Sequence, residues 1–336
     1  MVSGTSKIAV VLFQLGGPDS LEAVEPFLEN LFRDPDIIDF PFAKITREPL
    51  ARLIASRRSK KVRAYYERIG GKSPIGELTV FQAQALEREL QKSVDARVFI
   101  AMRYWHPLTQ EAVAQIQKEE YREVVLLPLF PQYSMTTTGS SVNEWNRRFR
   151  GDKHDHPPVK LIKHFYDHPL YVEAIVDNIN GTFKRFGRLD RSEVHLVFSA
   201  HGVPAKVIEQ GDPYQQHVKA TVQLVMELGG WKSPHHLCYQ SKVGPAAWLK
   251  PSLDETLHVL ASSGVKHVLV VPITFVTEHL ETLHEIDIET RTEAEHLDIQ
   301  QFEMMPALND HPTFIRALAD LVLHQVRSNQ VKHQRL

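Results

Sequence analysis

The sequence predicts an α/β fold made of two related domains, each with a parallel β-sheet flanked by helices. Short apolar runs alternate with longer amphipathic stretches along the 336 residues, which is the rhythm of strand-helix-strand units in parallel sheets. The two halves of the chain also resemble each other, which indicates a duplicated unit. With 43% hydrophobic residues, the chain can bury the cores that this organisation requires.

The apolar runs are short and rich in β-branched residues, which favours buried strands over helices. They occupy residues 8–15, 97–102, 123–129, 194–199, 236–240 and 267–273. Amphipathic stretches lie between them and predict helices, because their apolar side chains recur with helical spacing. These helices span 78–92, 109–118, 168–184, 214–228, 251–262 and 311–327.

Segments of matching composition recur at similar offsets in both halves. The pairs are 124–129 with 268–273, 167–172 with 310–315, and 13–16 with 198–201. Asp167 and Asp310 each precede a His-Pro pair, so we expect them at helix N-caps with proline in the first turn. We infer two copies of one unit, with an insertion at about 35–75 in the first copy. Chance similarity between α/β segments is the alternative.

Composition and charge exclude several classes of function. A net charge of −2 lacks the basic excess that general nucleic-acid binding requires. The single cysteine, Cys238, excludes an internal disulfide and a cluster held by four thiolates, and it fits a reducing cytoplasm. Residues 1–7 lead into the first strand without the pattern of a signal peptide, so we do not expect secretion. No apolar run reaches the roughly 18–20 residues that cross a bilayer.

The most unusual segment is Phe275–Glu289, which combines several carboxylates with two imidazoles and contains no lysine or arginine. On an α-helix, Glu278, Glu281, Glu285 and Glu289 would form one stripe, because their spacings match helical turns. Such a stripe repels itself unless a cation or a proton intervenes, so it suits a mobile metal ion. The segment follows a predicted strand, where open α/β sheets place their ligands.

A second candidate, His201, follows another predicted strand and precedes a Gly-Val-Pro turn. Its imidazole titrates near neutrality and can accept a proton or bind a divalent metal. A hydrogen-bonded structural histidine is the alternative, weakened because the acid stripe occupies the equivalent place on another strand. One imidazole with one or two carboxylates makes an incomplete site for Fe²⁺ or a similar borderline metal, with exchangeable ligands.

Familiar catalytic motifs are absent. No Gly-x-Gly pair occurs, which excludes the dinucleotide fingerprint and the kinase glycine loop. Walker A and His-Glu-x-x-His are missing as well, so neither a P-loop nor a zinc protease of that kind is predicted. The segment 139–141 lacks the second glycine of a serine-hydrolase elbow. Cys238 lies in a strand-like run, where we expect a small buried hydrophobe rather than a nucleophile.

The insertion contains Arg57–Lys61, Tyr65-Tyr66 and two glycines at 70–71. Guanidinium groups clamp carboxylates and rings stack on rings, so this composition suits a flat, anionic ligand. A solvated helix that stops at the glycines is the alternative interpretation of the same residues.

Together these motifs resemble the ferrochelatase family. The resemblance is carried by Ser199–Pro204, Gly211–Tyr214, Gln240–Pro245, Trp248-Leu249 and Phe275–Glu289. Further matches are Leu15–Pro18, Tyr66–Pro74, Met102–Tyr104, Pro107–Thr109, Pro131–Ser134 and Thr138–Ser141. They follow in order from about Ile8 to Leu323, and the combination is highly specific.

The resemblance implies a lyase that inserts Fe²⁺ into protoporphyrin IX, the terminal step of haem biosynthesis. It also implies two Rossmann-like domains with a porphyrin cleft between them. The first would span 1–165, with the porphyrin-binding insertion at 35–75 and a C-terminal helix, 310–330, packing back onto it. The second would span 166–309 and carry His201 and the acid stripe at 278–289.

The functional positions of the family match residues of this chain as follows. The catalytic and metal-binding pair matches His201 and Glu281. Positions that hold the porphyrin propionates match Arg58, Tyr66 and Ser73, and pocket-lining positions match Arg103, Tyr104, Trp248 and Phe275. An ion or proton path, along a helix with a π-type turn, matches Glu285 and Glu289, and we include Glu278 at its start.

Iron is expected only as a substrate, with no other cofactor. The extra C-terminal cysteines that hold a [2Fe–2S] cluster in animal members are missing, so we expect no such cluster. The apolar C-terminal anchor of photosynthetic relatives is missing as well, and Leu15 replaces a methionine of some members. We expect a cytoplasmic monomer without nucleic-acid partners, and we leave open a peripheral contact with the inner face of the cytoplasmic membrane.

Two other interpretations stay open. The nearest enzyme alternative is a chelatase for another tetrapyrrole, either coproporphyrin III or a cobalt-accepting corrinoid precursor. The Gln240–Pro245 motif and the insertion favour protoporphyrin. The alternative of another class is a haem or metal carrier that binds without turnover, in which loss of His201 would remove affinity rather than rate.

Overall fold

The chain forms two compact units in the computed structural model, which describes residues 6–38, 42–149, 157–242 and 246–333. Unit 1 comprises Met1–Phe165 and Asn309–Leu336, and unit 2 comprises Tyr166–Leu308. Each unit contains a four-stranded sheet in which every strand pair is parallel. The predicted α/β fold class is therefore confirmed.

The two sheets have equivalent strand orders, which confirms the internal repeat. Unit 1 has the order β2-β1-β3-β4, and unit 2 has the order β6-β5-β7-β8. The strands of unit 1 are β1 (Ile8–Gln14), β2 (Ala96–Met102), β3 (Glu123–Pro128) and β4 (Val159–Leu161). Those of unit 2 are β5 (Val194–His201), β6 (His235–Gln240), β7 (His267–Pro272) and β8 (Gln301–Met304). The edge strands β4 and β8 were not predicted, because they are too short to show a pattern.

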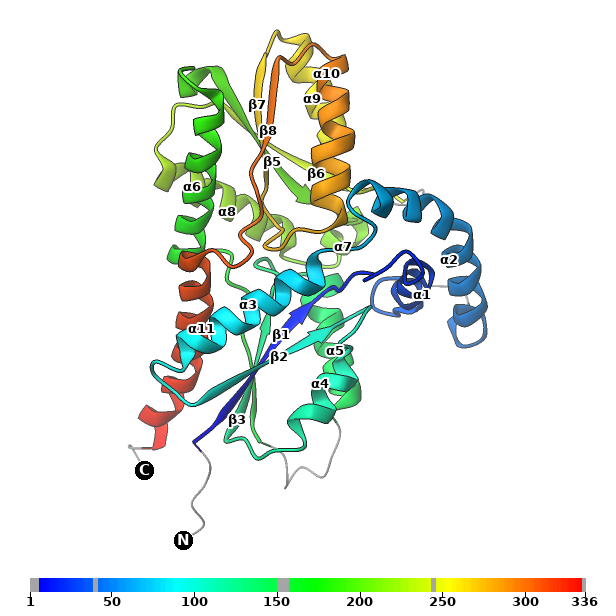
Figure 1. Cartoon of the computed structure of the whole chain (residues 1–336), viewed down its shortest axis with the longest axis vertical. Coiled ribbons are helices and arrows are strands. Elements are labelled where there is room, and N and C mark those ends of the chain that lie inside the picture. Colours follow the sequence, from blue (N-terminus) through cyan, green and yellow to red (C-terminus); the bar gives the residue numbers. More distant parts are fainter. Residues whose placement is uncertain (1–5, 39–41, 150–156, 243–245, 334–336) are drawn as a thin grey trace. The chain divides into compact units, whose positions relative to one another are not determined.

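Helices cover both faces of the sheet in unit 1. They are α1 (Val24–Arg33), α2 (Ala43–Arg68), α3 (Ile75–Leu90), α4 (Thr109–Ile116), the π-helical turn η1 (Met135–Gly139), α5 (Ser140–Arg148) and α11 (Pro312–His333). Figure 1 shows α3 and α11 on one face and α4 and α5 on the other. Trp145 of α5 and Val113 of α4 pack with alternate residues of β1 in one buried core.

Unit 2 repeats this layering. Its helical segments are α6 (Pro169–Phe183), two 3₁₀ turns (Lys184–Phe186 and Arg191–Glu193), α7 (Ala205–Glu209), α8 (Tyr214–Gly229), α9 (Leu253–Ser262), η4 (Glu281–Thr290) and α10 (Arg291–His296). Leu257 of α9, Ile286 of η4 and Ala294 of α10 pack with Val197 and Val270 in one core. The other face of the sheet carries α6 and α8 (Figure 1).

The insertion is a helix followed by a glycine turn. After α2, Gly70 and Gly71 adopt φ values of 101° and 84°, a conformation that favours glycine. The Gly71 N–H donates to the Tyr66 carbonyl at 2.8 Å. The helix α1 before it was not predicted. Residues 39–41 of the insertion and 243–245 of the Gln240–Pro245 motif lie outside the described residues.

The last helix returns to unit 1. The side-chain amide of Gln82 in α3 donates to the Asn309 carbonyl at 2.9 Å, and the Lys160 ammonium donates to the Gln325 carbonyl at 2.6 Å. The expectation that Asp167 is the N-cap of its helix is wrong, because α6 begins at Pro169 and His168 occupies the cap. Among the described residues, no helix is both long and apolar enough to span a membrane.

The core of unit 2 offers a matched pair of substitutions on α9. Leu257 is fully buried, whereas Val259 is 65% exposed. We expect Leu257→Ala to lower the free energy of unfolding by about 2–5 kcal/mol, because it leaves a cavity. Val259→Ala should change it by less than about 0.5 kcal/mol. Urea titration followed by circular dichroism measures both, and equal losses would contradict this placement of the core.

Candidate active site

His201 ends the central strand of unit 2, and its imidazole is oriented by its neighbours. Its Nδ1 lies 2.6 Å from the Gly202 carbonyl oxygen. A carbonyl only accepts, so Nδ1 carries the ring proton and Nε2 keeps its lone pair in the neutral ring. The Phe275 ring stands edge-on to the imidazole, with centroids 6.1 Å apart. His201 therefore offers one nitrogen that can accept a proton or bind a metal ion.

The turn after His201 requires glycine. A Cβ at Gly202 would lie 2.8 Å from the Gln240 carbonyl oxygen and 3.2 Å from Cε3 of Trp248. The predicted pocket residue Trp248 thus packs directly against the residue after His201. Its indole Nε1 is buried and has no hydrogen-bond partner among the described residues. The structure brings His201, Trp248 and Phe275 together at the carboxyl end of the unit 2 sheet.

Glu281 opens η4 and contacts a histidine that was not predicted. The Nε2 atom of His279 lies 3.0 Å from Oε2 of Glu281, and the two side chains are 7% and 28% exposed. The Nδ1 atom of His279 lies 3.1 Å from the Thr277 carbonyl, so it carries the ring proton. Both atoms of the His279–Glu281 contact are acceptors when deprotonated, so the contact holds a proton or a cation. The His-x-Glu spacing of these two residues in the sequence could have indicated this contact.

Glu285 is held by a loop that follows β6. Its carboxylate accepts the Ser241 N–H at 2.7 Å and also the Ser241 hydroxyl. Ser241 has φ of 65°, a conformation that costs free energy in a residue other than glycine. Burial raises the pKa of Glu285 and the Glu281 charge raises it further, while the Ser241 donors and His201 oppose the shift; the net pKa lies above the ordinary value. Glu285 therefore holds a proton more readily than an exposed glutamate.

The predicted stripe of four acids on one α-helix is wrong in its geometry. Glu278 precedes the helix, and its carboxylate accepts the Ala307 N–H at 2.7 Å and the Thr282 hydroxyl. The helix itself is a π-helix, as the resemblance implied, with roughly four to five residues per turn because its hydrogen bonds join residues five apart. Glu281, Glu285 and Glu289 follow one another at four-residue intervals along it. Glu289 lies 3.7 Å from Nδ1 of the buried His284.

Unit 1 holds the other predicted positions, which are Arg58, Tyr66, Ser73, Arg103 and Tyr104. Arg58 is exposed on α2, with its guanidinium 5.6 Å from the centre of the Phe32 ring. Tyr66, on the same helix, is 3% exposed. Ser73 donates its N–H to the Pro18 carbonyl at 2.8 Å. A Cβ at Gly17 would lie 2.5 Å from the Ser73 hydroxyl, so the loop after β1 lies directly on Ser73.

Arg103 and Tyr104 share a buried partner, Asp34, which was not predicted. The Arg103 guanidinium pairs with Asp34 at 2.8 Å and donates through Nε to the Ser140 hydroxyl at 2.9 Å. The Tyr104 hydroxyl donates to Asp34 at 2.6 Å, and Tyr104 is 1% exposed. Burial alone would raise the pKa of Asp34, but Arg103 and the two hydroxyl donors outweigh it and hold the pKa below its ordinary value. The buried Asp34 carboxylate thus holds the Arg103 guanidinium in one orientation.

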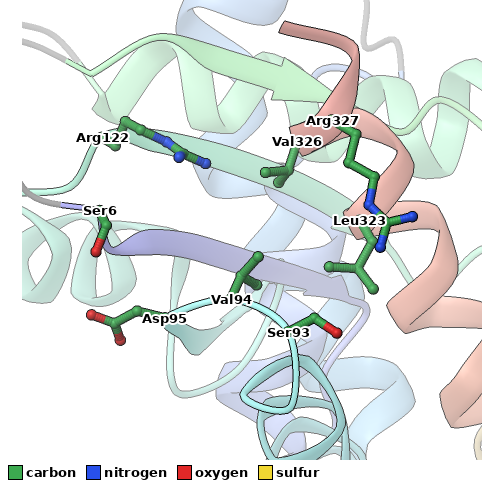
Figure 2. A pocket seen from close by; sticks show the side chains of 8 residues that line it. All are labelled: Ser6, Ser93, Val94, Asp95, Arg122, Leu323, Val326 and Arg327. Atoms are coloured by element: carbon green, nitrogen blue, oxygen red, sulfur yellow. The ribbon is translucent and has the colours of Figure 1, made fainter. Parts of the chain in front are cut away.

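A cavity of about 370 Å³ lies elsewhere in unit 1. It is lined by Ser6, Ser93, Val94, Asp95, Arg122, Leu323, Val326 and Arg327 (Figure 2). Five of these residues lie just before β1, β2 and β3, and the other three belong to α11. Ligands of open α/β sheets bind at the carboxyl ends, and none of the predicted site residues lines this cavity. Cys238 is no candidate nucleophile either, because burial raises the pKa of its thiol to about 12.

The Ser241 hydroxyl provides a test of the Glu285 environment. Ser241→Ala removes a donor that stabilises the carboxylate, so we expect the pKa of Glu285 to rise further above its ordinary value. Carbon-13 NMR titration of the glutamate carboxyl signals measures the shift. Ser263→Ala is the matched control, because the Ser263 hydroxyl donates only to the Val259 carbonyl. An unchanged Glu285 titration in Ser241→Ala would show that the hydroxyl contributes nothing.

Known proteins match this chain over almost its whole length. The family model described as Ferrochelatase matches residues 7–326. A ferrochelatase from Aquifex aeolicus is 49% identical over 320 residues, covering 95% of this chain and 100% of that protein. One from Geotalea daltonii is 49% identical, covering 95% of this chain and 98% of that protein. One from Synechocystis is 45% identical, covering 94% of this chain and 82% of that protein.

Solved structures with the same fold include chelatases of low sequence identity. SirB from Bacillus subtilis with Fe³⁺ superposes with a TM-score of 0.55 at 12% identity, covering 95% of this chain and 94% of that chain. The sirohydrochlorin chelatase SirB from Bacillus subtilis subspecies spizizenii in complex with cobalt gives a TM-score of 0.51 at 13% identity, covering 94% of each chain. At such identities the likeness shows the fold alone.

Proposed function

The chain belongs to the ferrochelatase family, and on this premise we propose that it inserts Fe²⁺ into protoporphyrin IX to form protohaem. The porphyrin loses two pyrrole N–H protons and gains four bonds to the metal, so charge balances without a redox step. The chain is an enzyme of the metal-chelatase class, a ferro-lyase. The observation that carries the proposal is His201, whose Nε2 has no hydrogen-bond partner among the described residues, in the same unit as the acid row Glu281, Glu285 and Glu289.

Removal of the pyrrole protons needs a base of suitable strength. With Nδ1 committed to the Gly202 carbonyl, the neutral His201 ring presents only Nε2 to a substrate. An imidazole with a near-neutral titration range can take a proton from the porphyrin and pass it on. We assign His201 as the base that receives a pyrrole proton, and equally as a nitrogen ligand that Fe²⁺ can bind before insertion.

Glu281 and His279 supply the second part of the site. Their contact holds one proton or one cation, and the Glu281 carboxylate remains partly exposed. A set of imidazole and carboxylate ligands suits Fe²⁺, and ligands this few release the ion readily. We propose that Glu281 is the acid-base or metal partner of His201, and that His279 adjusts the charge of Glu281 by sharing its proton.

The row from Glu285 to Glu289 is proposed as the path for ions or protons. Glu289 is 46% exposed on its side chain, whereas Glu285 is largely enclosed and its pKa is raised by burial. The row therefore runs from a solvent-exposed carboxylate to one that binds a proton readily. Glu278 is assigned to holding the start of η4, because its carboxylate accepts the Thr282 hydroxyl and the Ala307 N–H.

Unit 1 is proposed to bind the porphyrin. Arg58 is an exposed guanidinium, which suits a propionate. Tyr66 lies on the same helix, and Ser73 lies against the loop after β1. Arg103 is 11% exposed on its side chain, so Asp34 and Tyr104 support it as positioning residues. The rings of Trp248 and Phe275 in unit 2 suit the flat face of a tetrapyrrole. Iron is a substrate in this proposal, and no further cofactor, nucleic-acid partner or second subunit is required.

Turnover separates the proposed enzyme from its two alternatives. In an anaerobic, reducing assay of Fe²⁺ insertion, we expect turnover with protoporphyrin IX to exceed that with coproporphyrin III. His201→Ala should lower the rate by at least about 100-fold, because it removes the base. His106→Ala is the matched control, since the side chain of His106 is 58% exposed and its only ion pair in the described part of the chain is with Glu111.

Other results of this assay would revise the proposal in defined ways. A preference for coproporphyrin III would transfer the enzyme to that substrate. Stoichiometric porphyrin binding without turnover in the parent protein would identify a carrier instead of an enzyme. Full activity in His201→Ala would remove His201 from the chemistry.

The traffic along the acid row is tested by Glu285→Gln. This variant keeps the shape of the side chain and removes its charge and its proton exchange. If the row delivers metal, the lowered rate should be restored by excess Fe²⁺, because higher occupancy compensates for weaker delivery. If the row exports protons, the rate should stay low at all Fe²⁺ concentrations. An unaffected rate would contradict both roles.

A further inference from the structure

A second group of metal-ligating side chains lies on unit 2, outside the residues assigned above. Asp254 and His258 are one turn apart on α9, and Glu293 comes from α10. His258 Nε2 lies 3.7 Å from Asp254 Oδ1 and 3.4 Å from Glu293 Oε1. One ligand atom from each of the three lies within 4.8 Å of the other two. Figure 1 shows α9 and α10 on the same face of the unit 2 sheet.

The backbone beneath this cluster is fixed by the core. Leu253 and Leu257 of α9, each next to a member of the cluster, are buried together with Ala294 of α10, which follows Glu293. These contacts hold the two helices at a set distance. The side chains of Asp254, His258 and Glu293 need only small rotations to converge on one point. Little free energy is therefore lost in ordering these side chains when an ion binds.

The charges of the cluster lack a compensating cation. The ion pairs recorded for Asp254 and Glu293 in the described part of the chain involve only histidines, His258 and His296. Arg291, the nearest basic residue in sequence, pairs with Asp287 and donates to the Phe302 carbonyl. Two carboxylates with a neutral imidazole carry the charge that one divalent cation neutralises.

We propose that Asp254, His258 and Glu293 bind a divalent first-row transition-metal ion that joins α9 to the helix continuing from the acid row. One imidazole and two carboxylates suit Fe²⁺, Co²⁺ or Zn²⁺. Bonds of about 2.0–2.2 Å place two ligands of one ion at most about 4.3 Å apart. The two distances measured from His258 already satisfy this limit. Water or the nearby His296 completes the coordination.

This site shares no residue with the proposed catalytic site, and its expected effect is on stability. Its side chains are 71%, 51% and 39% exposed for Asp254, His258 and Glu293, so an ion reaches them directly from solvent. A bound ion cross-links two helices of one core, and it stabilises the folded state because the unfolded chain lacks the preformed ligand set. The site does not depend on porphyrin, so it stands whether or not the chain turns over.

Binding of Co²⁺ to the full chain tests the proposal. We expect equilibrium dialysis to find one ion fewer per chain in His258→Ala than in the parent protein. Asp254→Asn and Glu293→Gln should weaken binding at this site by at least about tenfold. Thermal unfolding should show a rise in Tm with Co²⁺, relative to a chelator, that is lost in His258→Ala. Chelatase turnover should remain in that variant.

Two control variants test whether the ion is bound at this cluster. Glu295→Gln lies on α10 beside the cluster and should keep both the bound ion and the rise in Tm. His201→Ala should lose any ion held by the catalytic residues while keeping the rise in Tm. The proposal is overturned if His258→Ala retains the parent stoichiometry and Tm shift, or if Glu295→Gln loses them to the same extent.

Discussion

The parallel pairing of β5 with β6 and β7 is the constraint on which the rest of the candidate site depends. Backbone register places His201 opposite Gln240 and Ser199 opposite Pro272, so three distant segments of chain end at one edge of the sheet. Side chains then join these ends: the Ser199 hydroxyl donates to the Gln240 side-chain oxygen at 2.6 Å, and the Gln240 amide reaches the Glu281 carbonyl at 3.3 Å. Without that register, the imidazole and the acid row would have no common location.

The carboxylate charges at this edge of the unit 2 sheet are compensated by protons and by hydrogen-bond donors. Glu285 is half-buried and lies near another carboxylate, and both effects raise its pKa, while the N–H and hydroxyl of Ser241 oppose the shift. Glu281 meets His279 across a contact that holds a proton or a cation. No lysine or arginine occurs from residue 275 to residue 289, and in the described part of the chain neither Glu281 nor Glu285 forms an ion pair with one. Such an arrangement favours an ion that arrives and leaves, and a π-helix sets the acids along its length.

The equivalent edge of the unit 1 sheet carries the opposite charge. There the edge is built around Arg103, whose charge is neutralised by the buried Asp34 and whose geometry is set by Ser140. Removing one member of a buried ion pair leaves the other uncompensated, so the pair is a strong local constraint. A repeated fold therefore presents guanidinium groups in one copy and carboxylates in the other.

Sequence patterns alone determined the fold class, six of the eight strands found in the described residues, six helices, the internal repeat, and the positions of His201 and of the acids after strands. These features repeat with periods of two or 3.6 residues, or lie next to such a segment, so they are local. The short strands β4 and β8 have no such period. Tertiary structure alone decided the contacts between residues far apart in sequence, and with them the burial that shifts each pKa. Those are Asp34 with Arg103, Ser241 with Glu285, Glu278 with Ala307, and Asp254 and His258 with Glu293. Desolvation and hydrogen bonding depend on which side chains meet in space, and no periodicity in a single chain records that.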